Sequence, residues 1–148
     1  MLLEYCPHSD MFEMLKQVAY QEGGSQNFIL GQKLTKYLFK TLLQTVDDLH
    51  RRVGIAHLDL KLENILIGEN FELKLCDFGF SDEVRTRHYQ DRGTQGYMPP
   101  EMLSHAPGGV EGQAADIYAL GVCLFTITFG VPPFFNASLS DRYYKLIY

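Results

Sequence analysis

The sequence contains three cysteines, too few and too scattered for a disulfide framework. Cys6, Cys76 and Cys123 are far apart, their number is odd, and no two of them form a C-x-x-C pair. The same spacing argues against a structural zinc site. We therefore expect free thiols and an intracellular, cytoplasmic protein.

The sequence also lacks an excess of positive charge and a long apolar run. Its net charge is -5, which gives no indication of a nucleic-acid partner. The longest apolar run, residues 117–129, is too short to span a bilayer and predicts a buried helix. No signal peptide is predicted, because neither a basic start nor a long apolar stretch follows Met1. The hydrophobic fraction of 46% suffices for one domain with a real core.

Helical periodicity predicts three main helices, at residues 11–19, 30–53 and 113–129. Asp10 is expected to cap the first helix, with Glu13 as its partner in a capping box. Gly54 is expected to end the second helix in a left-handed conformation. The third helix is apolar on all sides and should lie in the centre of the domain. The apolar residues that recur at helical spacing in the second helix are Leu34, Leu38, Leu42, Val46, Leu49 and Val53.

The other predicted elements are short. Residues 1–6 should end a strand, and further strands are predicted at residues 55–57, 65–67 and 71–76. A loop at residues 21–27, a short helix from Pro99 and a last amphipathic helix from Ser140 complete the prediction. Residues 79–100 show no periodicity, which is unusual for so long a stretch and typical of a functional segment. The expected fold class is mainly α with a short β ribbon, α+β overall.

Four polar residues have the chemistry that phosphoryl transfer needs. Such a site requires a carboxylate near the acceptor hydroxyl, a cation near the phosphoryl group and oxygen ligands for Mg²⁺. Asp59 and Lys61 could supply the first two, and Asn64 and Asp77 could supply the ligands. Each signal is weak alone, since an isolated Asp-Phe-Gly more often marks an ordinary turn at the end of a strand.

Together, four sequence blocks resemble a known family. They occur in one order along the chain: His57–Asn64, Asp77–Gly79, Gly93–Glu101 and Asp116–Gly121. In this order they resemble the large, helical C-terminal lobe of a Ser/Thr protein kinase. The resemblance implies a protein-kinase-like fold for residues 1–148, from the hinge to the helix after the Pro-Pro-Phe segment. It also implies a partial domain that lacks the small lobe and the C-terminal helices.

The resemblance implies binding of ATP and Mg²⁺ and phosphorylation of Ser or Thr in a protein substrate. Asp59 matches the catalytic base and Lys61 the lysine that contacts phosphate, while Asn64 and Asp77 match the Mg²⁺ ligands. The nucleotide would lie against the N-terminal segment and one strand. The implied contacts are Leu3 as gatekeeper, the backbone of Glu4 and Cys6 at adenine, Asp10 at the ribose, and Met11 and Leu66 as the floor.

Five further residues match supporting positions of the family. His57 and Phe78 match stacked residues of the regulatory spine, and Asp116 matches the buried aspartate that holds the catalytic loop. Thr94 together with Lys61 indicates Ser/Thr rather than Tyr specificity. Glu101 matches a glutamate that pairs with an arginine in the C-terminal helices.

Two functions remain open at this point. The intact set of polar residues favours an enzyme. The missing small lobe favours a non-catalytic kinase-like module that binds a partner protein or a separate small lobe. We expect the lobe alone to bind ATP poorly, because water screens the charges of an open site.

One departure from the family pattern predicts how the protein is regulated. Leu58 occupies the position of an arginine that normally pairs with a phosphorylated loop residue. Gln90, which cannot be phosphorylated, occupies the matching loop position, and phosphate on Thr86 or Tyr89 would lack this partner. We therefore predict that activity does not depend on a phosphate switch at this site. Mapping a loop phosphate on which activity depends would contradict this.

Overall fold

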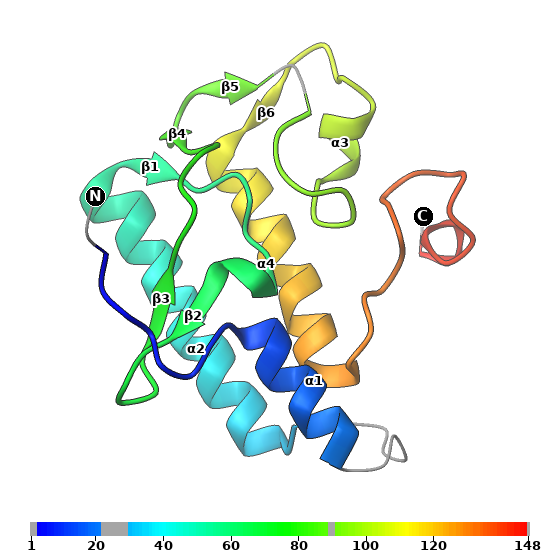
Figure 1. The fold of residues 1–148 in the computed structure, drawn as a ribbon. Coiled ribbons are helices and arrows are strands. Elements are labelled where there is room, and N and C mark those ends of the chain that lie inside the picture. The colour runs from blue at the N-terminus through cyan, green and yellow to red at the C-terminus, as the bar shows by residue number, and fades with distance from the viewer. Residues whose placement is uncertain (1–2, 22–29, 89–90, 148) are drawn as a thin grey trace.

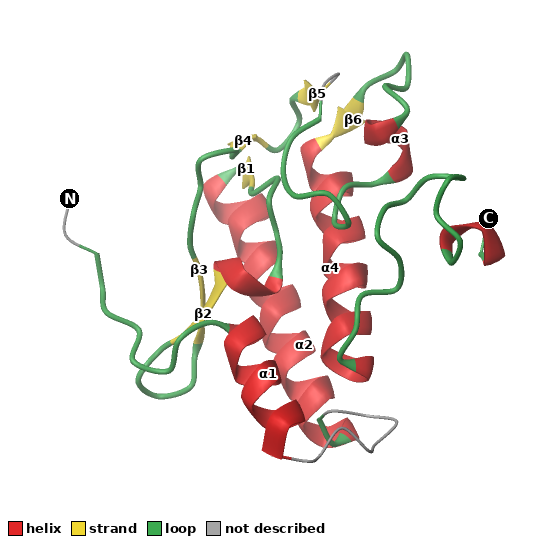
Figure 2. Ribbon diagram, turned by 45° about the vertical axis from the view of Figure 1, so that its right-hand side comes forward, coloured by secondary structure: helices red, strands yellow, loops and turns green. Residues whose placement is uncertain are grey.

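The computed structural model describes residues 3–21, 30–88 and 91–147, and this part is mostly helical (Figure 1). Its α-helices are α1 (Met11–Gln21), α2 (Gln32–Asp48), α3 (Pro100–Leu103) and α4 (Gly112–Phe129). Figure 2 shows α1, α2 and α4 as a layer of neighbouring helices, with α3 beyond one end of α4. The predicted fold class, mainly helical with short β ribbons, is confirmed.

Helix α1 begins at Met11 as predicted, but only one of the two hydrogen bonds of the predicted capping box forms. The backbone N–H of Glu13 donates to Oδ1 of Asp10 at 2.9 Å, which is an N-cap. The Glu13 carboxylate does not return the bond, because it pairs with Lys16 at 2.8 Å. The helix also continues two residues beyond the predicted end at Ala19, to Gln21.

Helix α2 changes its hydrogen bonding near its end. It begins at Gln32, and after Asp48 it widens into a π-helical turn over Leu49–Val53. Gly54 closes this turn at φ 82°, and its N–H donates to the Leu49 carbonyl, five residues back, at 3.0 Å. The predicted left-handed end at Gly54 is therefore confirmed. Ordinary helical spacing does not apply across a π-turn, which explains why Val53 is exposed although its spacing predicts burial.

The strands form antiparallel pairs that each join distant parts of the chain or close a tight turn. The pairs are β1 (Ile55–Ala56) with β4 (Asp82–Glu83), β2 (Ile65–Ile67) with β3 (Leu73–Leu75), and β5 (Arg87–His88) with β6 (Val110–Glu111). The segment of residues 79–100, here called the activation segment, is thus not without structure, since it supplies β4 and β5. Strands β1, β2 and β3 lie within the strands predicted at residues 55–57, 65–67 and 71–76, whereas β4, β5 and β6 are too short to show alternation and were not predicted.

Two predicted elements at the ends of the chain are wrong. Residues 3–6 form no strand, although Asp10 makes an isolated bridge to Leu66. The helix predicted from Ser140 is reduced to a 3-10 turn at Tyr144–Leu146. The Asp141 carboxylate there accepts the backbone N–H groups of Phe135 and Tyr143, so it ties a loop together instead of starting a long helix. The predicted loop at 21–27 lies outside the described residues except for Gln21.

Helix α4 is the core helix, and it packs against α2. By length and composition alone it could cross a membrane, but half of it is buried inside the protein. Its other side exposes Ile117, Phe125 and Phe129, so the prediction of burial on all sides is wrong. Most buried residues of the main core come from α1, α2, α4, the β2–β3 ribbon and the 3-10 turn at Leu62–Asn64, and they include Met11, Leu42, Val46, Leu62, Ile65, Leu120 and Ile127.

Two leucines of α2 test this account of the core. Leu42 is 0% exposed whereas Leu34, on the same predicted stripe, is 46% exposed. We expect Leu42→Ala to lower the free energy of unfolding by about 2–5 kcal/mol, because it leaves a cavity. Leu34→Ala, a control with the same change in helix propensity, should cost less than about 1 kcal/mol. Equal losses in urea unfolding would contradict the burial described here.

Candidate active site

A buried carboxylate of α4 fixes the loop that carries the candidate catalytic residues. Asp116 is 1% exposed. Its Oδ2 accepts the backbone N–H of His57 at 2.8 Å, and its Oδ1 accepts that of Leu58 at 2.8 Å. Nε2 of His50 lies 2.8 Å from Oδ2 and supplies a third donor. A carboxylate removed from water needs such donors, so the loop and the helix stabilise each other.

The loop backbone at Leu58 is strained and closely packed. Leu58 has φ 65°, a left-handed conformation that costs a leucine about 1–2 kcal/mol. Its side chain is buried with apolar residues of the neighbouring elements. Gly93, at φ 100°, crosses this turn so closely that an added Cβ would overlap the Leu58 carbonyl oxygen. The apolar residues of this cluster are Ala56, Leu58, Met98, Met102, Val110 and Ala115.

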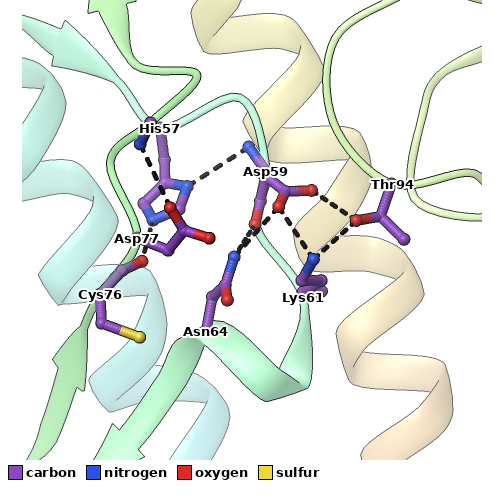
Figure 3. Close-up of polar contacts among 8 residues, drawn as sticks. His57, Asp59, Lys61, Asn64, Cys76, Asp77 and Thr94 are labelled. Atoms are coloured by element: carbon purple, nitrogen blue, oxygen red, sulfur yellow. Dashed lines mark hydrogen bonds and ion pairs between the residues drawn. The ribbon is translucent and has the colours of Figure 1, made fainter.

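Asp59 lies at the centre of a network that involves both of its carboxylate oxygens (Figure 3). Its Oδ1 accepts the hydroxyl of Thr94 at 2.7 Å, and its Oδ2 lies 2.9 Å from Nζ of Lys61. Lys61 also donates to Thr94 at 2.8 Å, which closes the triangle. Nδ2 of Asn64 donates to the Asp59 carbonyl at 2.9 Å and to Oδ2 at 3.2 Å. The amide donors of Asn64 are therefore engaged, and its Oδ1 is the atom that can coordinate a cation.

His57 connects this loop to the Asp77-Phe78-Gly79 turn. Its Nε2 donates to the Cys76 carbonyl at 2.9 Å, and its Nδ1 accepts the N–H of Asp59 at 3.3 Å. These partners fit a neutral imidazole with the proton on Nε2. The Phe78 ring lies 4.8 Å from the His57 ring, centroid to centroid. Asp77, between Cys76 and Phe78, has φ 57° and is exposed. Figure 3 shows its carboxylate next to the loop that carries Asp59.

The residues expected to surround the nucleotide are arranged less tightly. Leu3 is 77% exposed and has no gatekeeper-like packing here. Glu4 is exposed and forms an ion pair with Lys74. Cys6 and Leu66 are half-buried, and the Asp10 carboxylate caps α1 while its backbone bridges to Leu66. Met11, expected in the floor, is fully buried in the main core.

The thiols near the site remain protonated at neutral pH. Burial, and then the Asp77 charge, raise the pKa of Cys76. Burial raises the pKa of Cys123 to about 12. Neither group is therefore an activated nucleophile. Glu101, half-buried on α3, forms no ion pair within the described residues.

Comparison with known sequences shows which protein family the chain belongs to. The sequence profile described as "Protein kinase domain" matches residues 1–147. The chain belongs to this family. The family match covers nearly the whole chain, including every residue of the Asp59 network and the Asp116 anchor.

Individual relatives in the protein kinase family are of moderate similarity. The chain is 32% identical to CBL-interacting protein kinase 26 of Oryza sativa subsp. japonica, over 98% of this chain and 28% of the relative. It is 35% identical to the phosphorylase b kinase gamma catalytic chain, liver/testis isoform, of Mus musculus, over 85% of this chain and 32% of the relative. It is 32% identical to Aurora/IPL1-related protein kinase 2 of Caenorhabditis briggsae, over 97% of this chain and 43% of the relative. The chain thus spans less than half the length of these curated relatives.

Two residues of the site were missed from the sequence. His50 was not predicted to contact Asp116, although it stands four residues after Val46 and is buried in the π-helical turn at Leu49–Val53, an unusual place for a polar side chain. Lys74 was not predicted to pair with Glu4. A half-buried lysine in a short strand gives no sequence signal, so only the structure reveals that pair.

A pair of glycines tests the contact between the loop and the activation segment. Gly93→Ala would strain a left-handed backbone and push against Leu58 and Asp59, so we expect unfolding free energy to fall by about 1–3 kcal/mol. Gly108→Ala is the control, since nothing lies within 4 Å of its added Cβ and its φ is not left-handed. Its effect should stay within about 0.5 kcal/mol. Similar losses for both variants in urea unfolding would contradict the close approach.

Proposed function

We propose that this lobe carries the catalytic half of an ATP- and Mg²⁺-dependent Ser/Thr protein kinase. The observation that supports this most is the Asp59 network. One carboxylate, one ammonium and one carboxamide converge there around a loop anchored by α4. Phosphoryl transfer depends mainly on such positioning and on charge stabilisation.

Each side chain has a role in the proposed reaction that its contacts allow. Asp59 takes the proton of the acceptor hydroxyl, and its oxygens are held in place by Thr94 and Asn64. Lys61 reaches Asp59 and Thr94 through one ammonium, so it lies where it could also contact a phosphoryl group beside the acceptor. Lys61 and Thr94 match residues that mark Ser/Thr specificity in the family, and their contact supports that specificity here. Bound Mg-ATP supplies the phosphoryl group.

The donors available for Mg²⁺ fit its preference for hard oxygen ligands. Asn64 offers Oδ1, and Asp77 offers an exposed carboxylate. Within the part of the chain that the structure describes, no group of three His, Cys, Asp or Glu side chains could hold a metal. A Mg²⁺ ion held by Asn64 and Asp77 would complete its shell with water and phosphate oxygens, as is usual for this ion.

Two variants test this proposal, one expected to affect the binding of Mg-ATP and the other the transfer of phosphate. We expect Asp77→Ala to abolish the Mg²⁺-dependent rise in melting temperature that ATP causes, because it removes a ligand. Asp59→Asn should keep that rise but lower phosphate transfer to Ser- and Thr-containing peptides by at least about 100-fold. Thermal shift and radiolabel transfer measure the two quantities.

Glu69→Ala is a matched control, because it removes an exposed carboxylate from the turn between β2 and β3. It should behave like the unmodified chain in both measurements. Transfer to Tyr peptides at the Ser/Thr rate, or transfer by Asp59→Asn at the unmodified rate, would contradict the proposal. A folded chain that melts at the same temperature with and without Mg-ATP would count against a working site in the lobe by itself.

A further inference from the structure

The activation segment is held on the lobe by β5 and its neighbours. His88 pairs with Val110 and Arg87 with Glu111 in the β5–β6 ladder. The Arg87 guanidinium also reaches the Glu111 carboxylate at 2.7 Å and the Gly108 carbonyl at 2.8 Å. Arg87 is exposed, whereas His88 points inward, so the two residues hold the segment in different ways.

His88 is buried, and in the described part of the chain one nitrogen of its imidazole ring is enclosed without a hydrogen-bond partner. It is 5% exposed, and its Nε2 has no hydrogen-bond partner among the described residues. A Cβ added at Gly112 would lie 3.6 Å from this Nε2, 3.5 Å from Cδ2 of Leu58, and in overlap with Cβ of Ala56. The imidazole thus faces the first residue of α4, beside the strained turn of the catalytic loop.

The charges around His88 disfavour a proton on its ring. Asp82 on β4, whose charge acts on the His88 ring, is already paired with Arg92 at 3.2 Å. Glu111 on β6 is paired with Arg87, and Asp116 on α4 is occupied by the catalytic loop and His50. Gly112 starts α4, so the positive end of that helix lies beside the ring. Burial, and then the Arg92 charge, lower the pKa of His88, while Asp82 opposes them.

We propose that neutral His88 holds the activation segment on the catalytic lobe and that protonation of its imidazole releases the segment in mild acid. A histidine whose folded pKa is depressed binds fewer protons when docked than when released. Docking is therefore complete above the ordinary value of about 6.5 and weakens as the pH falls below it. Release would withdraw Thr94, later in the same segment, from Asp59.

Hydrogen exchange of the purified chain at pH 7.5 and 5.5 tests this proposal without any nucleotide. After correction for intrinsic rates, peptides that contain β5 and β6 should exchange roughly three- to tenfold faster at pH 5.5. His88→Leu, which cannot be protonated, should remove this acceleration. His88→Lys, which is charged throughout, should show fast exchange already at pH 7.5. Peptides from the core of α2 serve as the reference for global unfolding.

His105→Leu is the matched control, because it also removes one histidine close to the activation segment. His105 is exposed and lies 3.3 Å from Asp91, so protonation strengthens its ion pair and cannot cause release. This variant should keep the acid response. The proposal is overturned if His88→Leu responds to acid like the unmodified chain, or if the unmodified chain shows no local acceleration. A midpoint at or above 6.5 for the wild-type imidazole in an NMR titration would overturn it independently of any variant.

Discussion

The hydrogen bonds to the Asp116 carboxylate are the interaction on which the rest of this lobe depends. A carboxylate inside an apolar helix is costly unless donors surround it, and here two backbone amides and an imidazole do so. The same bonds hold Leu58 in a backbone conformation that it would otherwise avoid. The strain at Leu58 is thus compensated by the buried carboxylate, and Asp59 follows in a fixed position.

The activation segment depends on that fixed loop. Gly93 fits against the Leu58 carbonyl, which places Thr94 within hydrogen-bond distance of Asp59. Leu58 packs in an apolar cluster that reaches both β6 and α3 through Val110 and Met102. At the position where the family usually has an arginine to bind phosphate, this chain has an apolar contact and a buried histidine beside it. Leu58 and His88 are both buried on the lobe, and we propose that this packing takes the place of a phosphate-dependent ion pair in holding the segment.

The sequence predicted those parts of the fold that have a repeating pattern or a specific cap. Helices α1, α2 and α4, the Asp10 cap and the left-handed Gly54 follow from spacing and backbone chemistry that act locally. The sequence grouped Asp59, Lys61, Asn64 and Asp77 as the reacting set and named Thr94 as a supporting residue. The structure joins Asp59, Lys61, Asn64 and Thr94 by hydrogen bonds, and Asp77 lies exposed beside them. Strand β1 lies within the strand predicted at residues 55–57, but the π-turn, strands β4, β5 and β6, and the burial of His50 and His88 have no sequence pattern from which they could be predicted. The helix predicted from Ser140 is wrong, since only a 3-10 turn forms there, and Asp141 also binds the amide of Phe135 in the preceding loop.

Amide exchange at His57 and Leu58, resolved residue by residue with NMR, tests most directly whether Asp116 organises the lobe. These two N–H groups donate to a buried carboxylate, so they should exchange only through large-scale unfolding, at rates similar to the core of α2. Asp116→Asn, which keeps the size of the side chain but removes its charge, should accelerate their exchange well before that of α2. Exchange at His57 and Leu58 as fast as in exposed loops of the unmodified chain, or no change with Asp116→Asn, would contradict the account.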